Sequence, residues 1–249
     1  MIIPATWTTF SLIFYIAFGL FAVLLGPLDY FEWLPMRYSK FGTEKGVPSR
    51  LGMIILYGLP LIVATVAAQP YLSTATTTVQ WIVYGIVMLH FAKRTLEVLF
   101  VHKYSGKIQP LSLGIIIFAY ALMGGLISWL NVNAIPQMDF LFYLGMVSFL
   151  IGALGNTYHH RLLANLRKEK DGYFIPKGGW FDYAACPHYF FELLGWLGIV
   201  LVSRHLFTVL VFIAMLGYLG ARSIKTHQWY RERFDDYPSD RKNMIPFIF

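Results

Sequence analysis

Residues 156–192 read NTYHHRLLANLRKEKDGYFIPKGGWFDYAACPHYFFE and form a polar, basic stretch in a chain that otherwise consists largely of apolar runs. The apolar runs on either side of this stretch decide the fold, and the stretch itself is where chemistry is expected. Ionisable groups inside or beside a bilayer cost about 2.5–3.5 kcal/mol each on insertion scales, so such a cluster needs partners or a ligand. A charged ligand is the expected occupant.

The composition is that of an integral membrane protein. It is 57% hydrophobic and 18% aromatic, with only 13% charged residues, which exceeds what one soluble core of this size needs. Because a lipid-exposed backbone must satisfy its own hydrogen bonds, apolar runs long enough to cross about 30 Å of hydrocarbon should be helices. We therefore predict an all-α, polytopic membrane protein with seven transmembrane helices, at residues 7–27, 51–70, 78–101, 111–130, 140–163, 187–202 and 206–222.

The lysines and arginines orient these spans. With seven helices, nearly all of those outside the spans fall on the side of the carboxyl-terminal tail, and the opposite connections hold only Arg204. The positive-inside rule then predicts a lumenal or outside amino terminus and a cytosolic carboxyl terminus. The location would be the endoplasmic reticulum membrane in a eukaryote and the cytoplasmic membrane in a bacterium. Topology accounts for the net charge of +7, so nucleic acid is not an expected partner.

The chain is expected to form a single membrane domain over residues 1–249, since it has no internal repeat, low-complexity tract or linker. Its first apolar run is too long for a signal-peptide core and is taken as an uncleaved helix. The single cysteine, Cys186, excludes an intrachain disulfide. No metal is expected, because the adjacent His159 and His160 would point about 100° apart on a helix.

A first charged cluster lies in the run 78–101. The segment HFAKRTLE places His90, Lys93, Arg94 and Glu97 on one helical face, at spacings of three, four and seven. Charges in the middle of a span must face a cavity or other helices. The alternative is a self-neutralising cluster near the membrane interface.

A second cluster combines Asn156, His159, His160 and Arg167, at spacings close to three, four and seven. The guanidinium of Arg167 could bind a phosphate with two hydrogen bonds, and Lys168 adds a further positive charge. Ordinary positive-inside flanking is the competing interpretation. A Rossmann domain is not expected, since no G-x-G-x-x-G follows a strand.

A third cluster joins His188 and Glu192, one helical turn apart, with residues from the end of the last run: Arg222, His227 and Tyr230. Taken singly, His188 would be a helix-end residue with its hydrogen bonds satisfied, and Glu192 would be the partner in a buried salt bridge. Three clusters that converge on one membrane face instead favour a binding site for a large anion.

Four segments resemble, in order and spacing, the carboxyl-terminal domain of the steroid 5α-reductase family. They are NTYHHRLLANLRK (156–168), GYFIPKGGWFDY (172–183), CPHYFFE (186–192) and FDDYPSDRKNMIPFIF (234–249). KRTLEVLFVHKYSG (93–106) is also similar to the trans-2-enoyl-CoA reductases of the same superfamily, and the segments SKFG and SRLGMIILYGLP resemble the plant branch. The resemblance implies substrate-side helices over 1–85 and a cofactor-binding region over 86–249.

The family implies NADPH bound in a cytosol-facing cavity and reduction of a carbon–carbon double bond conjugated to a carbonyl. The resemblance implies that the dinucleotide is lined by Asn156, Arg167, Tyr173, His188, Glu192 and Tyr230, with Arg94 and Arg222 nearby. His160 and His227, from the clusters above, complete the candidate cofactor-binding residues. His160 stands where the family has an aspartate, so its own contact is a departure.

The substrate pocket departs further from the family. Animal steroid reductases hold the steroid carbonyl with a Gln–Glu pair and a tyrosine, and the equivalent positions here are Tyr57, Gly58 and Phe91. Hydride addition builds negative charge on the carbonyl oxygen, which needs a positioned donor, and the α-carbon needs a proton. The catalytic candidates are Tyr57, Tyr189 and Lys93, although aromatic packing is the alternative for both tyrosines.

The expected partners are a lipophilic small molecule that enters from the bilayer and the membrane lipids, with no protein partner required. A 3-oxo-Δ4-steroid ranks first as substrate, and a long-chain trans-2-enoyl-CoA is the alternative. More remote alternatives are an isoprenylcysteine-type methyltransferase, whose cofactor lacks phosphate, and a non-enzymatic lipid-binding protein.

Overall fold

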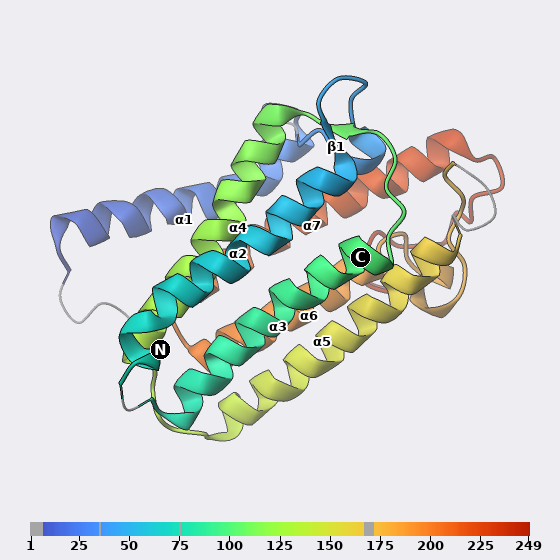
Figure 1. The fold of residues 1–249 in the computed structure, drawn as a ribbon. Helices are drawn as coiled ribbons and strands as arrows, with labels where there is room; N and C mark the ends of the chain where they lie inside the picture. The colour runs from blue at the N-terminus through green and yellow to red at the C-terminus, as the bar shows by residue number, and fades with distance from the viewer. Residues whose placement is uncertain (1–6, 35, 75, 167–171) are drawn as a thin grey trace.

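The computed structural model describes residues 7–34, 36–74, 76–166 and 172–249, and seven α-helices make up most of this part (Figure 1). Each apolar run predicted from the sequence is a helix. The helices are α1 (Thr9–Tyr30), α2 (Ser49–Leu72), α3 (Thr78–Phe100), α4 (Pro110–Leu130), α5 (Phe140–Asn165), α6 (Pro187–Ser203) and α7 (Leu206–Arg233). Short 3-10 turns follow at η1 (Ser39–Phe41), η2 (Asn131–Asn133) and η3 (Gly179–Asp182).

Five of these helices, α1, α2, α4, α5 and α7, are long and apolar enough to cross a membrane. Of the other two, α3 is long enough but has the charged residues Lys93, Arg94 and Glu97 within it, and α6 is an apolar helix of only 17 residues. The structure is therefore a multi-pass membrane fold.

The helix starts follow local sequence signals. The Thr77 hydroxyl accepts from the amide of Gln80, whose side chain bonds back to the Thr77 amide in a capping box that begins α3. Pro110 and Pro187 occupy the first turns of α4 and α6, where a missing N–H costs nothing. These signals fix the helix starts at the residues where the apolar runs begin.

The helices form an elongated bundle in which α5 packs chiefly on α6, α2 on α4 and α3, and α1 on α7 (Figure 1). Glycine brings α5 and α6 together: a Cβ at Gly152 would lie 2.3 Å from the Gly195 nitrogen, and one at Gly198 would lie 2.5 Å from the Phe149 nitrogen. Small residues permit such close backbone approach between membrane helices. The α5–α6 pair is therefore a close, rigid contact.

Connections gather at one end of the bundle. There β1 (Val47–Pro48) pairs antiparallel with β2 (Lys107–Ile108), which joins the α1–α2 connection to the α3–α4 connection. At the same end Ala184, just before α6, bridges to Lys242 of the tail. These contacts build a polar cap over the helix ends, and the site lies beneath it.

Candidate active site

A cavity opens at this end of the bundle. Its walls come from all of the helices α2 to α7 and from three connecting segments, residues 38–40, 102–105 and 173–174. The empty space is about 1410 Å³, including the open mouth. The structure brings together most of the site residues predicted from the sequence. Those that line the cavity are Tyr57, Arg94, Asn156, His160, Tyr173, His188, Tyr189, Glu192 and Tyr230.

The charged face of α3 lies against α5. Glu97 is buried, with its carboxylate 3.0 Å from the Lys93 ammonium, 2.6 Å from the Arg94 guanidinium and 2.9 Å from the Nδ1 of His160. The Thr157 hydroxyl donates at 3.0 Å to Oε1 of this carboxylate, the oxygen that also contacts Lys93. A buried carboxylate needs such compensation, so Glu97 pairs with both cationic residues, Lys93 and Arg94, and joins α3 to α5.

Arg94 connects this charged cluster to α2. Its Nη2 donates to the Tyr57 hydroxyl at 2.8 Å, and its guanidinium carbon lies 4.6 Å from the centre of the Tyr57 ring. Its Nη1 meets Glu97 and, at 2.7 Å, the Nδ1 of His160. Arg94 is thus held from both sides and presents one edge to the cavity.

Asn156 joins three helices. Its side-chain oxygen accepts from the Lys93 ammonium at 2.5 Å, and its Nδ2 donates to the His188 carbonyl at 2.9 Å. Lys93, a catalytic candidate from the sequence, therefore lies behind the cavity wall between Asn156 and Glu97.

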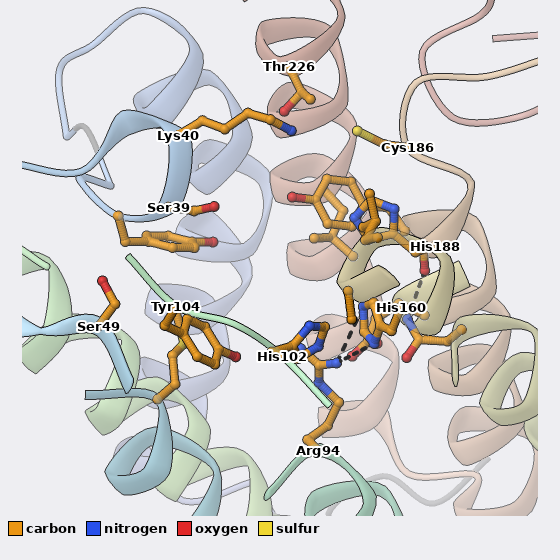
Figure 2. Close-up of a pocket in the computed structure, with 18 of the residues that line it drawn as sticks. Ser39, Lys40, Ser49, Arg94, His102, Tyr104, His160, Cys186, His188 and Thr226 are labelled. Carbon is orange, nitrogen blue, oxygen red and sulfur yellow. Dashed lines mark hydrogen bonds between the residues drawn. The ribbon is translucent and has the colours of Figure 1, made fainter. Parts of the chain in front are cut away.

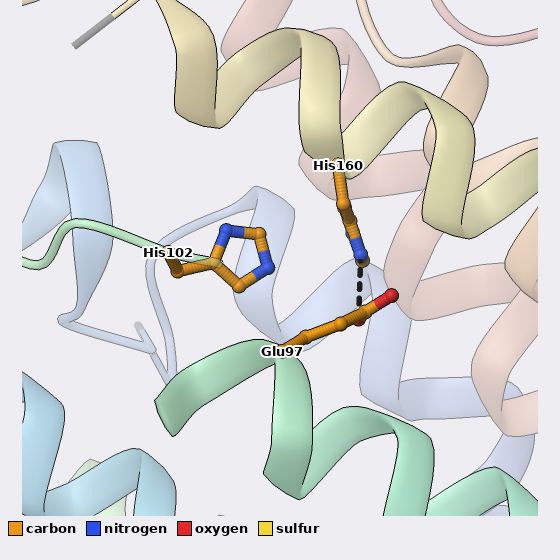
Figure 3. A group of neighbouring side chains, drawn as sticks. All are labelled: Glu97, His102 and His160. Atoms are coloured by element: carbon orange, nitrogen blue, oxygen red, sulfur yellow. Dashed lines mark hydrogen bonds and ion pairs between the residues drawn. The ribbon is translucent and has the colours of Figure 1, made fainter. Parts of the chain in front are cut away.

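Three side chains of types that can bind metals, Glu97, His102 and His160, lie close together (Figure 3). Each offers one ligand atom, and these atoms lie within 4.8 Å of one another. The carboxylate of this group already meets Lys93 and Arg94. A divalent cation would have to compete with two adjacent positive charges, so the donor set suits a charge-compensated cluster better than a metal centre.

The first turn of α6 supplies the next part of the wall. The Nδ1 of His188 is buried and has no hydrogen-bond partner in the described part of the chain. Glu192 faces the cavity one turn further on, with its carboxylate 3.6 Å from the Nε2 of His90. Cys186 caps this helix, and burial raises the pKa of its thiol to about 11.

Lys40 is a basic residue of the cavity that the sequence analysis did not single out. It extends toward Cys186 and Thr226 in Figure 2. Its ammonium lies 4.4 Å from the ring centre of Tyr230, 5.7 Å from that of Trp229 and 5.8 Å from that of Tyr173. Aromatic faces attract cations at such distances, so this group holds a positive charge at the cavity.

Arg222 and His227 lie behind the wall. Arg222 is buried, donates to the Met36 carbonyl at 3.1 Å, and has its guanidinium 4.5 Å from the ring centres of both Tyr38 and Phe41. It thereby fixes the segment that carries Lys40. His227 instead lies 2.7 Å from the Oδ1 of Asn243 in the tail, and Arg167 falls outside the described residues.

The sequence analysis also missed several other polar lining residues: Tyr38, Ser39, Ser49, His102, Lys103, Tyr104, Tyr120 and Thr226. Most lie in connections, where no periodicity marks a face. Ser49, Tyr120 and Thr226 lie in helices instead. Of these, Tyr120 had a usable signal, because it is the one tyrosine in the apolar run 111–130 and such a polar group is expected to face inward.

The sequence is similar to those of known proteins. A family model described as 3-oxo-5-alpha-steroid 4-dehydrogenase matches residues 107–249. The chain is 32% identical to 3-oxo-5-alpha-steroid 4-dehydrogenase 1 of Bos taurus, covering 85% of this chain and 86% of that protein. It is 33% identical to steroid 5-alpha-reductase DET2 of Arabidopsis thaliana over 56% of this chain and 57% of that one. Polyprenal reductase 1 of Oryza sativa subsp. indica shares 36% identity over 43% of this chain and 31% of its own length.

These matches span the helices that build most of the cavity and confirm the resemblance seen in the sequence. They also confirm that the chain is an enzyme that acts on CH–CH groups. With a multi-pass helical fold, a cavity at one end of the bundle and this agreement over more than half its length, the chain belongs to the 3-oxo-5-alpha-steroid 4-dehydrogenase family.

Proposed function

We propose that this enzyme reduces a carbon–carbon double bond conjugated to a carbonyl in a lipophilic substrate, with NADPH as reductant. The Δ4 bond of a 3-oxo-steroid is the first choice of substrate. The observation that carries the proposal is a single cavity with two kinds of wall. One wall holds Lys40 among aromatic rings, and another presents a tyrosine hydroxyl, Tyr57, bonded to Arg94.

The cavity residues fit a nicotinamide dinucleotide. Within the described lining, Lys40, Arg94 and Lys103 supply positive charge against the one carboxylate of Glu192, which suits a polyanion. The buried His188 Nδ1 and Arg94 Nε have no hydrogen-bond partner among the described residues, so a ligand could satisfy them. When bound, NADPH supplies a hydride. The proposed binding residues are Lys40, Arg94, Asn156, His160, Arg167, Tyr173, His188, Glu192 and Tyr230, with Arg222 and His227 supporting the wall.

The relatives' names support the steroid. The Bos taurus and Arabidopsis proteins are named for 3-oxo-steroids and steroids, whereas the match to a polyprenal reductase covers a smaller part of the chain. Phe91, Tyr120 and Met53 give the region around Tyr57 an apolar, aromatic character. A rigid apolar tetracycle with one carbonyl suits such a pocket.

We further propose seven spans, in which α3 and α6 join the five long apolar helices. Their charged or polar positions face the protein interior, as Glu97 and His90 do. The amino terminus would then be lumenal or outside and the cavity cytosolic, because the connections around it carry most of the lysines and arginines. The substrate would enter from the bilayer.

The cofactor is tested by binding NADPH and NADH to the purified protein in mild detergent. Arg167 and Lys168 could pair with a 2′-phosphate, so NADPH should bind more tightly, and Arg167→Ala should weaken its binding at least tenfold. Arg161→Ala, an exposed arginine of α5, is the matched control and should bind NADPH like the wild type. Equal wild-type affinity for both nucleotides would contradict this part of the proposal.

The substrate is tested by following NADPH oxidation with progesterone or testosterone, a long-chain trans-2-enoyl-CoA and a polyprenal. We expect turnover of the steroid, with the 5α-reduced product identified by mass spectrometry. Oxidation with the thioester alone would make the protein an enoyl-CoA reductase, and no oxidation with any of the three would overturn the reaction class.

A further inference from the structure

The pair formed by Tyr57 and Arg94 stands where a carbonyl-binding device is required. The family resemblance places Gly58 and Phe91 at positions where animal steroid reductases carry polar groups. A Cβ at Gly58 would meet no atom within 4 Å, and Phe91 is fully buried. The hydroxyl of Tyr57, by contrast, belongs to a residue that lines the cavity and carries a cationic partner.

We infer that Tyr57 is the hydrogen-bond donor to the substrate carbonyl and that Arg94 is the positioning residue that aims it. The inference rests on the proposed enone reduction and names the group that recognises the substrate. It also separates Tyr57 from the other two catalytic candidates.

The direction of the hydrogen bond between Arg94 and Tyr57 determines where the tyrosine proton points. A guanidinium has five N–H donors and no acceptor, so in the 2.8 Å contact Arg94 donates and the Tyr57 oxygen accepts. The tyrosine proton must therefore point elsewhere. In the described part of the chain, this is the one hydrogen bond that the Tyr57 hydroxyl makes, which leaves its proton for a ligand in the cavity.

The orientation of the pair is fixed on both sides. The Arg94 guanidinium lies against the Tyr57 ring at 4.6 Å and is itself anchored to Glu97 at 2.6 Å. The ring of Tyr120 meets Tyr57 edge-on, with ring centres 5.6 Å apart. Because the hydroxyl is held before a ligand arrives, little reorganisation is needed when charge develops at the carbonyl.

The competing candidates lack this arrangement. The Lys93 ammonium is directed to Asn156 and Glu97 and lies outside the lining. Tyr189 lines the cavity, but among the described residues it has no hydrogen bond to a cationic side chain. A charge-assisted donor is the stronger one, so Tyr57 is the better match.

NADPH, the proposed reductant, would supply the hydride and be oxidised to NADP⁺. The added hydride forms a C–H bond at the β-carbon, and the π electron pair shifts to give a C=C bond between the α-carbon and the carbonyl carbon, with negative charge on oxygen. Tyr57 donates a hydrogen bond to that oxygen and keeps its proton. The positive charge of Arg94 stabilises the negative charge on the oxygen. The α-carbon then takes a proton from solvent, and the carbonyl is restored.

The first test compares Tyr57→Phe with Tyr84→Phe, the same change on α3 at a hydroxyl that bonds Thr65 outside the cavity lining. Loss of one preorganised donor lowers kcat by about a hundredfold or more. We expect this loss in Tyr57→Phe with unchanged NADPH affinity, and wild-type kinetics in Tyr84→Phe. A larger isotope effect with 4-deuterated NADPH should accompany the loss, because the chemical step becomes slower.

Ligand binding gives a readout that needs no turnover. Wild-type protein should bind a saturated 3-oxo-steroid more tightly than its 3-deoxy analogue, and Tyr57→Phe should bind both alike. The inference would be overturned if Tyr57→Phe kept activity within twofold of wild type or lost NADPH binding. It would also be overturned if the fall in kcat appeared in Tyr189→Phe instead. Absence of enone reduction in the wild type would instead overturn the proposed function.

The role of Arg94 is tested by a double-mutant cycle. Arg94→Lys keeps the charge but loses the guanidinium geometry, and we expect kcat to fall about tenfold or more. If Arg94 acts through Tyr57, the same change in the Tyr57→Phe background should lower kcat no further. Fully additive losses would show that Arg94 acts independently and would overturn its positioning role.

Discussion

The two sides of the cavity are built differently. On one side α5 and α6 meet through glycine, and Asn156 bonds to both Lys93 and the α6 backbone. On the other side Ser49, Met53 and Tyr57 of α2 line the cavity, and Gly58 leaves open space. The family model matches residues 107–249, which include α4 to α7 and exclude α1 to α3.

This contrast indicates a division of labour. Close helix contacts and buried hydrogen bonds hold the proposed cofactor residues in one geometry, whereas on α2 Arg94 holds the hydroxyl of Tyr57 and the neighbouring Gly58 leaves open space. We therefore expect substitutions on the α5–α6 side to act on folding and cofactor binding, and those on the α2 side to act on substrate choice.

The largest effect is expected from Glu97→Gln, which removes the carboxylate that neutralises Lys93 and Arg94. Breaking a buried ion pair from one side costs about 3–5 kcal/mol, because uncompensated charge remains. Thermal unfolding in mild detergent should show a large drop in Tm, and the exposed Glu44→Gln should change it little. Equal Tm values for both variants would mean that the α3–α5 connection is not structurally important.

Two glycine substitutions compare the sides directly. Gly152→Ala places a Cβ 2.3 Å from the Gly195 nitrogen, and such overpacking typically costs about 1–3 kcal/mol. Gly58→Ala meets nothing within 4 Å and should raise stability by roughly 0.5–1 kcal/mol, because alanine favours the helix. Similar Tm values for the two variants would remove the contrast between a rigid and an open side.

The substitution Lys40→Met tests whether the amino-terminal third of the chain contributes to cofactor binding. The ammonium lies over Tyr230 at the cavity, and its loss should weaken NADPH binding about tenfold, which corresponds to roughly 1.4 kcal/mol. The exposed Lys45→Met on the same connection is the control. An unchanged NADPH dissociation constant in Lys40→Met would confine the cofactor site to the carboxyl-terminal helices.

The smallest effect concerns the opposite end of α7. The Nδ1 of His205 accepts from the Phe207 amide, and burial lowers the pKa of this imidazole from 6.5 to about 4. Since the folded pKa lies below the unfolded one, protons favour the unfolded state, and stability present above pH 6.5 is lost as pH falls toward 4. His205→Asn keeps a capping side chain without this titration, so its Tm should fall less over that range.

Much of the fold could be predicted because hydropathy alone marks a membrane helix. The predicted runs 78–101 and 140–163 correspond to α3 (Thr78–Phe100) and α5 (Phe140–Asn165) within two residues. Arg94 and Glu97 share a helical face and form an ion pair, in agreement with their spacing. The α7 helix continues to Arg233, past the apolar run, because a helix leaving the membrane can extend in water.

The remainder depends on tertiary contacts that periodicity does not encode. Lys40 reaches the cavity from a segment that Arg222, far later in the sequence, holds through the Met36 carbonyl and the Tyr38 ring. Lys93 shares the face of Arg94 but turns to Asn156, and this choice depends on where α5 lies. Connections and side-chain partners across helices therefore required the structure.

The buried thiol of Cys186 gives the chain a built-in reporter. It is the only cysteine in the sequence, it lines the cavity, and its pKa of about 11 keeps it protonated at neutral pH. Since only the thiolate is reactive, alkylation should be slow at pH 7, faster in alkaline buffer, and confined to one position. The labelling rate would then measure how fully the cavity is occupied, without any engineered probe.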